Sequence, residues 1–339
     1  MSGKVGDNTG LQSGAVASAA AGIESLSSDP TAEHGKCWFN STTSLLKVYN
    51  NVGAWSTGGN LNAGRTEANS GTNGTQTACF IAGGTVSGGR TLTSETYDGS
   101  SWTTRGNMTG TARGGCSNFG TMTAGAAAGG WTGSIQTLTN EFNGASWTDA
   151  SAALATGSTA HGACGTQTAA LSRVGSYNDV ARGSSCEEYD GSSHSSGGSL
   201  SGNRGDATTC GTLTSAVQAG GQSAGGAANI LTICQTYNGS SWTTNSATLN
   251  EKRRNQAIFG ASDSDATICG GNDNSVDLAT VESWNGTAWS SEEDLPAAIA
   301  TIQGCGSSSG TGLISGGTSN SNATKEFSQT VTAQTITDS

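Results

Sequence analysis

The sequence ETYDGSSW at residues 95–102 recurs in four variants that decide the fold: NEFNGASW at 140–147, EEYDGSSH at 187–194, QTYNGSSW at 235–242 and ESWNGTAW at 282–289. Each copy consists of an aromatic residue, Asp or Asn, glycine, two small residues and a final tryptophan, which His194 replaces in one copy. Counted from Trp55, these final positions are 45 to 48 residues apart. A pattern that returns at this period is typical of proteins built from copies of one supersecondary unit.

Each repeat is predicted to contain four short strands. The Asx-Gly step favours a tight type I′ turn with positive φ at both central residues, between a strand that ends at the aromatic residue and one that begins at the tryptophan position. A first strand is expected where Cys116, Cys164, Cys210 and Cys305 align with Phe259 and Ser70. The second strand ends in Gly-Gly, which allows close backbone approach, although the third repeat keeps only ALSRVGS at 170–176. The other copies are ACFIAGG at 78–84, AGAAAGG at 124–130, AVQAGG at 216–221, ATICGG at 266–271 and LISGG at 313–317.

Four antiparallel strands with Gly-Gly after the second and aromatic residues in the last two resemble the kelch repeat. The resemblance covers residues 55–339 and implies an all-β fold, a kelch-like β-propeller of four-stranded antiparallel blades. We expect six blades, with the strand at Trp55 completing the sixth. Seven would result if the N-terminal strands and the C-terminal tail formed a blade together. A sandwich or a solenoid fits less well, because a sandwich does not repeat one hairpin pattern at a fixed spacing.

The composition argues against several classes of protein. The chain has 53 Gly, only 14 Lys and Arg, and a formal net charge of −11, which disfavours binding to nucleic acid or to an anionic membrane. No apolar run approaches the length of a membrane span. The nine cysteines are odd in number and include no CxxC pair, so we expect reduced, buried thiols rather than disulfides or a metal site.

The segment CWFNSTTSLLKVYNNVGAW at 37–55, with Gly35 before it, resembles a hairpin common in bacteriophage tail-fibre and other virion proteins. Its pattern there is G-x-x-W-Y-N-T-T-T-x-x-L-K-V-Y, followed by a tryptophan; Phe39 and Ser41 depart from it mildly. The resemblance implies a structural protein of a phage particle. The matching residues are Gly35, Trp38, Asn40, Thr42, Thr43, Leu46, Lys47, Val48, Tyr49 and Trp55.

Residues 1–36 lack the repeat and are rich in Gly, Ala and Ser. We expect them to be an N-terminal arm that attaches the protein to other virion proteins, and residues 37–339 to form the propeller. A disordered leader, or a short helix around Ala15–Ile23, is the alternative. No secretory signal peptide is recognised, so we expect a protein made in the host cytoplasm and released on the virion by lysis.

Residues with chemical potential are few and scattered. His34, His161 and His194 lie in different repeats, and no catalytic, cofactor-binding or metal-binding residue is assigned. Arg204-Gly205-Asp206 spells an integrin-type tripeptide that enters a predicted strand, and the charged run Glu251–Arg254 is expected to be a solvated loop. Four arginines enter first strands, where they either line an anionic ligand pocket or, as we prefer, stabilise loop ends: Arg65, Arg113, Arg204 and Arg254.

The sequence thus predicts a non-enzymatic phage virion protein without cofactors, whose propeller serves host-surface adhesion or virion contacts. The expected partners are other virion proteins and a host-surface glycan or protein, and we expect an oligomer on the virion. The alternatives are a glycan- or peptide-binding kelch adaptor and, less favoured, an enzyme resembling galactose oxidase. The sequence does not predict the ligand or the place on the particle.

Overall fold

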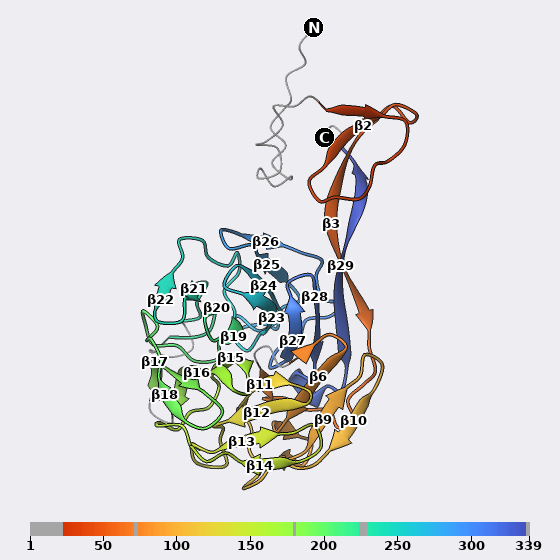
Figure 1. The fold of residues 1–339 in the computed structure, drawn as a ribbon. Coiled ribbons are helices and arrows are strands. Elements are labelled where there is room, and N and C mark those ends of the chain that lie inside the picture. The colour runs from red at the N-terminus through yellow and green to blue at the C-terminus, as the bar shows by residue number, and fades with distance from the viewer. Residues whose placement is uncertain (1–22, 71–73, 179–180, 224–228, 337–339) are drawn as a thin grey trace. The chain divides into compact units, whose positions relative to one another are not determined.

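The computed structural model describes residues 23–70, 74–178, 181–223 and 229–336, and within them the fold is all-β (Figure 1). Six sheets have four to six strands each, and a further pair of strands forms a small sheet of its own. The described residues include no α-helix, only the short 3-10 turn η1 (Thr318–Asn320), and no helix among them is long and apolar enough to cross a membrane. The prediction of an all-β, propeller-like fold is therefore confirmed.

The chain divides into two compact units. Unit 1 comprises residues 1–53 and 329–339, and unit 2 comprises residues 54–328. This division differs from the expected boundary after residue 36, because the segment after it forms strands that pair with β1 (Glu24–Leu26) and with the C-terminal part of β29 (Thr324–Thr335). Residues 1–22, which hold most of the expected arm and of its alternative helix, lie outside the described residues.

Each complete repeat forms one antiparallel sheet whose strands follow one another in the order of the sequence. In the first repeat, β7 (Thr85–Val86) and β8 (Gly89–Arg90) form a separate small hairpin between the second and third strands of the sheet. The short strand β4 (Asn69–Ser70) pairs in parallel with the first strand of the second sheet. The first sheet consists of β5 (Gly74–Thr75), β6 (Ala78–Ala82), β9 (Ser94–Tyr97) and β10 (Trp102–Arg105), and the second of β11 (Ser117–Thr121), β12 (Ala124–Ala128), β13 (Thr139–Phe142) and β14 (Trp147–Asp149). The third sheet consists of β15 (Gly162–Thr166), β16 (Ala169–Asn178), β17 (Ala181–Tyr189) and β18 (His194–Ser196), and the fourth of β19 (Thr208–Thr212), β20 (Ser215–Ala219), β21 (Cys234–Tyr237) and β22 (Trp242–Thr244). The fifth sheet consists of β23 (Ala257–Ser262), β24 (Asp265–Cys269), β25 (Val281–Trp284) and β26 (Trp289–Ser291).

The sixth sheet combines the two ends of the chain. Its order is β27 (Gln303–Ser308), β28 (Thr311–Ser315), β29 (Thr324–Thr335), β3 (Leu45–Thr57), β2 (Cys37–Asn40) and β1 (Glu24–Leu26), reading from one edge to the other. Trp55 of β3 packs on Phe327 of β29 with ring centroids 4.9 Å apart. An aromatic pair of this kind occurs in every repeat, for example between Tyr97 and Trp102 at 5.0 Å. Trp55 therefore fills the tryptophan position that the last repeat lacks in its own sequence.

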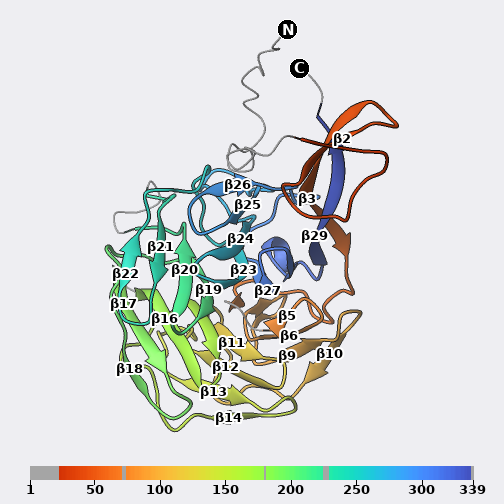
Figure 2. The ribbon, with the colours of Figure 1, turned by 45° about the horizontal axis from the view of Figure 1, so that its top comes forward.

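The first strands of successive sheets neighbour one another in unit 2. β11 contacts β15, β15 contacts β19, β19 contacts β23, and β23 contacts β27. β27 in turn contacts β5 of the first sheet, so the series returns to its start. Figure 2 shows β5, β11, β19, β23 and β27 toward the middle of unit 2, with the fourth strands β14, β18 and β22 farther out.

Hydrogen bonds from aromatic side chains connect neighbouring sheets. The hydroxyl of Tyr237 donates to Glu188 at 2.5 Å, and the hydroxyl of Tyr189 donates to Glu141 at 2.8 Å. The indole Nε1 of Trp147 similarly donates to the hydroxyl of Ser94 at 3.0 Å. These aromatic residues therefore stabilise the packing between sheets as well as the hairpin within each sheet.

The predicted strand ends on either side of the turn are confirmed, but the predicted type I′ conformation of the turn is wrong. Tyr97 pairs with Trp102, so four residues connect the strands, and Gly99 is the one among them with positive φ (91°). A carboxylate oxygen of Asp98 accepts hydrogen bonds from the backbone N–H groups of Ser100 and Ser101, both within 3.0 Å. This side-chain bonding closes the turn without a left-handed conformation at the Asx residue. The same two bonds occur at Asn143, Asp190, Asn238 and Asn285.

The glycine pairs give the close backbone approach that the sequence pattern predicts. Gly83 and Gly84 have φ of 70° and 92°, and a Cβ on Gly84 would lie 2.6 Å from the carbonyl oxygen of Thr66. In the third repeat, where serine follows Gly175, β16 and β17 continue past this point as a longer hairpin. The loss of the second glycine therefore coincides with an extended pair of strands.

The cysteines are unpaired and mostly buried, but one alignment is wrong. All nine are free, and all except Cys37 are buried. Cys164, Cys210 and Cys305 are the third residues of β15, β19 and β27. Cys116 instead precedes β11, whose third residue is Phe119. The apolar run there offered two registers three residues apart, and the structure selects the one with Phe119.

Candidate functional site

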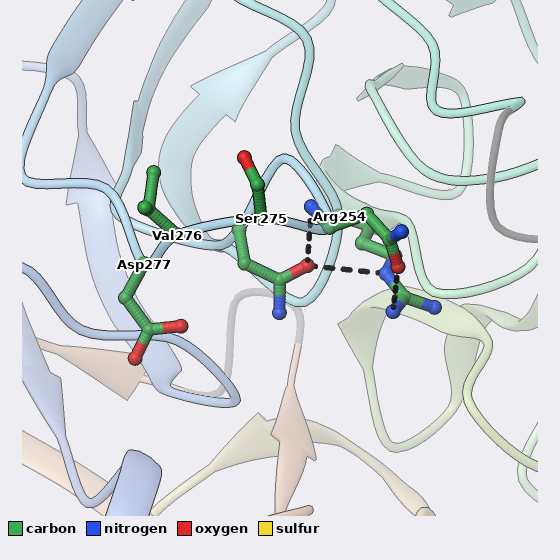
Figure 3. A pocket seen from close by; sticks show the side chains of 6 residues that line it. Arg254, Ser275, Val276 and Asp277 are labelled. Carbon is green, nitrogen blue, oxygen red and sulfur yellow. Dashed lines mark hydrogen bonds between the residues drawn. The ribbon is translucent and has the colours of Figure 1, made fainter.

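A small pocket lies on the loop between β24 and β25 (Figure 3). Its volume is about 180 Å³, and backbone hydrogen bonds between Arg254 and Asn272 fix its base. Asp273 holds the loop, because its carboxylate accepts hydrogen bonds from Ser275 and from the N–H of Val276, which lower the pKa of Asp273 to about 2. The lining residues are Arg254, Asn272, Asn274, Ser275, Val276 and Asp277.

Arg254 is the central side chain of this pocket. Its Nε donates to the side-chain oxygen of Asn272 and its Nη2 to that of Asn274, both at 3.1 Å. Asp277 points away from Arg254 in Figure 3, and its carboxylate accepts a hydrogen bond from Thr318 at 2.8 Å. The guanidinium of Arg254 is therefore positioned by the neutral amides of Asn272 and Asn274, and Asp277 does not neutralise it.

A second arginine, from the third sheet, joins Arg254, which precedes the first strand of the fifth sheet. Arg182 of β17 donates to Asp206 at 2.8 Å and to the side-chain oxygen of Gln222 at 2.6 Å. Nη1 of Arg254 donates to the same oxygen of Gln222 at 2.7 Å and lies 3.8 Å from the Asp206 carboxylate. We call Arg182, Asp206, Gln222, Arg254, Asn272 and Asn274 the arginine cluster.

The arginine cluster is locally cationic although the protein is acidic. Two guanidinium groups share one carboxylate, and both remain partly accessible, with 14% of the Arg182 side chain and 24% of the Arg254 side chain exposed. Guanidinium groups in such a position bind carboxylates and hydroxyl oxygens through planar pairs of N–H donors. The cluster is thus suited to contact an acidic or hydroxyl-rich partner.

The four arginines predicted to enter first strands do not form one set. Arg65, Arg113 and Arg204 are at most 2% exposed, and the equivalent residue in the fifth repeat is Arg253, which is completely buried. Each of these lies two residues before a position of positive φ, namely Glu67, Gly115, Asp206 and Asn255. The prediction that Arg254 occupies this position is wrong by one residue. The prediction that Glu251–Arg254 form a solvated loop is also wrong, because Arg253 is buried.

The buried arginines hold loop ends, as expected. Nη2 of Arg65 pairs with Glu95 at 2.5 Å, and Nη1 donates to the carbonyl oxygens of Gly83 and Thr93. Arg253 makes the equivalent bonds, to Glu282 at 2.8 Å and to the carbonyl oxygens of Gly270 and Thr280. Nη2 of Arg113 instead donates to the amide oxygen of Asn140 at 2.7 Å.

The three histidines are not brought together. Burial lowers the pKa of His161 to about 3, so this side chain is neutral inside the third sheet. His194 stacks on Tyr189 at 4.5 Å and hydrogen-bonds to the hydroxyl of Thr139 in the preceding sheet, which is how it replaces the tryptophan. His34 lies in unit 1, where Nδ1 accepts from the N–H of Asn51. Within the described ranges, no three His, Cys, Asp or Glu side chains are grouped for a metal ion.

The Arg204-Gly205-Asp206 tripeptide is not presented as an adhesion motif. Arg204 is 2% exposed, and Asp206 is engaged by Arg182. The sequence singled out Arg254 but missed Arg182, Gln222 and Asn272. Gln222 and Asn272 share the repeated position directly after Gly-Gly, whereas Arg182 lies on β17 of the third repeat. Their convergence follows from the packing of sheets, which the repeat pattern does not indicate.

The comparisons with known proteins bear on the fold. The solved structure titled "Structure of YjhT" matches with a TM-score of 0.64 and 12% identity over 80% of this chain and 99% of that chain. At this identity the likeness shows a shared fold alone. No protein-family model matches the chain, and no curated protein matches it in sequence.

Proposed function

We propose that this chain is a non-enzymatic structural protein of a bacteriophage virion, with unit 1 attaching it to the particle and unit 2 making contacts with the host surface or with other virion proteins. The observation that carries the proposal is the hairpin that resembles phage tail-fibre proteins. It folds as β2 and the start of β3 in unit 1, separately from the repeats.

The surface of unit 1 supports a role in attachment. Of the five exposed large apolar side chains in the described parts of the chain, Ile23, Phe39, Leu45 and Val331 belong to unit 1. Phe39 and Leu45 lie on neighbouring paired strands, at 38% and 40% exposure. Apolar side chains that stay exposed on one small unit offer surface for a protein partner to cover.

We further propose that the six large sheets are the blades of a six-bladed, kelch-like propeller. The position of β3 next to β29 supports this count, because the N-terminal strand then completes the last blade. Such a closure leaves no open edge between the first and last repeats to pair with other chains.

The arginine cluster favours adhesion by unit 2, and it equally favours the second candidate, a glycan- or peptide-binding adaptor. Its residues come from three successive sheets, and all except Arg182 of β17 lie in loops, where propellers can vary side chains without disturbing the repeats. An acidic or hydroxyl-rich host-surface molecule is the partner that these donors fit.

Complementation of a phage that lacks the gene tests the virion role. We expect the full-length protein in purified particles, whereas a variant without residues 1–36 should fold, remain soluble and be absent from them. An immunoblot with antibodies against unit 2 gives the occupancy. Absence of the full-length protein from particles would contradict the virion role, and wild-type occupancy of the truncated protein would contradict attachment through this segment. Arg182→Gln with Arg254→Gln should leave occupancy unchanged and reduce adsorption to host cells, which separates adhesion from attachment.

A further inference from the structure

Arg113 and Arg204 are the two buried loop arginines without an ion pair among the described residues, and Arg113 instead donates to the amide oxygen of Asn140. The residue that faces such an arginine lies two positions before the repeat aromatic, where Glu95 and Glu282 pair with Arg65 and Arg253. In the fourth repeat this position holds Gln235. The fourth repeat therefore keeps the buried cation and lacks the acid that neutralises it.

The amide of Gln235 does not replace the missing acid. Its Nε2 donates to the hydroxyls of Ser201 and Thr244, and its oxygen has no hydrogen-bond partner among the described residues. Nε and Nη1 of Arg204 also have no hydrogen-bond partner within the described part of the chain. A buried guanidinium without a paired charge is strongly unfavourable, since it loses its hydration without compensation. Burial accordingly lowers the pKa of Arg204 to about 10.

A pocket of about 420 Å³ lies beside this unpaired arginine. Ser201 and Asn203 supply polar groups to its wall, and Leu231 and Ile233 supply apolar surface. The pocket is large enough for a small organic molecule with an apolar or hydroxylated body. Its lining residues are Ser201, Gly202, Asn203, Arg204, Ser223, Leu231 and Ile233.

We propose that this pocket binds a small organic carboxylate, whose charge takes the place that Glu95 and Glu282 fill in the first and fifth repeats. One uncompensated guanidinium matches the single charge of a carboxylate, whereas a phosphate dianion would leave surplus negative charge. The carbon body of the ligand would lie against Leu231 and Ile233. The proposal stands on Arg204 and its surroundings, and it holds whether or not the protein is carried on a virion.

The substitution Gln235→Glu is the sharpest test, because it supplies the internal acid. Isothermal titration calorimetry of the full-length protein with propionate, glucuronate and phosphate, at constant ionic strength set by sodium chloride, measures binding. We expect a carboxylate to bind the wild type and to bind Q235E roughly tenfold more weakly or worse, as the loss of a charge-assisted hydrogen bond implies. The control Gln136→Glu adds the same charge on a loop where the side-chain amide of Gln136 donates to Thr132 and Ser134, and it should bind as the wild type does.

Comparison of glucuronate with propionate shows which kind of carboxylic acid the pocket prefers. Preference for glucuronate assigns the charged group to a sugar acid, and preference for propionate assigns it to an aliphatic acid; either result supports the proposal. Equal affinity in Q235E, binding of phosphate alone, or no binding of either carboxylate would overturn it. Q235E should also melt at a higher temperature than the wild type without ligand, and a lower one would mean that Arg204 is already neutralised.

Discussion

The hydroxyl of Tyr97 donates a hydrogen bond to the carboxylate of Glu326 at 2.5 Å, across 229 residues of sequence. It joins the first sheet to the last in the same way that Tyr237 joins Glu188 in neighbouring sheets inside the repeat array. The indole of Trp102 adds a second bond across this junction, to the hydroxyl of Thr324 at 2.8 Å. The junction between the ends of the repeat array is therefore built from the same contacts as the junctions within it.

The tyrosine contacts predict a loss of stability at alkaline pH. Burial, and next the hydrogen bond to the glutamate, raises the pKa of Tyr97 and of Tyr237 from 10.0 to about 12. The unfolded chain releases these protons near pH 10 while the folded chain keeps them, so the stabilisation is complete below pH 10 and is lost as the pH rises toward 12. Urea unfolding across this range measures the effect. Tyr97→Phe should make the decline shallower, whereas Tyr49→Phe, at a tyrosine of unit 1, should leave its slope unchanged; equal slopes in all three proteins would contradict the account.

Truncation of Trp102 should destabilise unit 2 strongly. The side chain is 5% exposed, packs on Tyr97 and bonds to Thr324. Trp102→Ala should therefore cost about 3–5 kcal/mol of unfolding free energy. Trp131 lies outside the repeated positions, half-buried beneath the guanidinium of Arg90 at 3.7 Å, so Trp131→Ala should cost much less. Similar losses in the two variants, measured by chemical denaturation, would argue against a structural role for the repeated aromatic residues.

Substitution of the two adjacent arginines in the fifth repeat should affect the stability of the protein to very different degrees. Arg253→Gln removes one partner of the buried pair with Glu282 and should destabilise the protein by about 3–5 kcal/mol. Arg254→Gln removes a partly exposed side chain of the arginine cluster and should change stability by less than about 1 kcal/mol. Thermal and urea unfolding of the two variants provide the comparison. If Arg254→Gln lowered the free energy of unfolding more than Arg253→Gln, the assignment of Arg253 as the buried arginine would be contradicted.

The thiols should react in two classes. Burial raises the pKa of Cys186 to about 11 and that of Cys269 to about 12, so neither forms a thiolate readily, and burial also blocks access. Cys37 is the one cysteine that is not buried. Native protein should therefore react with a thiol reagent rapidly at one cysteine and slowly at eight, and Cys37→Ser should abolish the rapid phase. Several rapid thiols in the Cys37→Ser variant would contradict the buried positions.

The sequence predicts the repeats well, because the hairpin pattern and Gly-Gly are dictated by local backbone requirements. The sequence-based alignment fails where two registers satisfy the same pattern, as at Cys116 and at Arg253 beside Arg254. There the position of the following residue with positive φ distinguishes the two registers, and the structure shows that position. The type I′ geometry predicted for the turn at Asp98 is wrong, since side-chain hydrogen bonds replace the expected backbone conformation. The unpaired state of Arg204 could have been found in the sequence by aligning Gln235 with Glu95 and Glu282. The arginine cluster could not, because its residues meet through the packing of different sheets.

The central claim is that the N-terminal strand completes the last sheet of the repeat array, and the pairing of Trp55 with Phe327 tests it most directly. Nuclear Overhauser spectra of protein labelled selectively at tryptophan and phenylalanine should contain cross-peaks between these two rings, whose centroids lie 4.9 Å apart. Trp55→Phe identifies the tryptophan signals by their disappearance. Cross-peaks that vanish in this variant are the result the account predicts. Their absence in the wild type, with Trp55 in contact with other aromatic rings or with none, would contradict it.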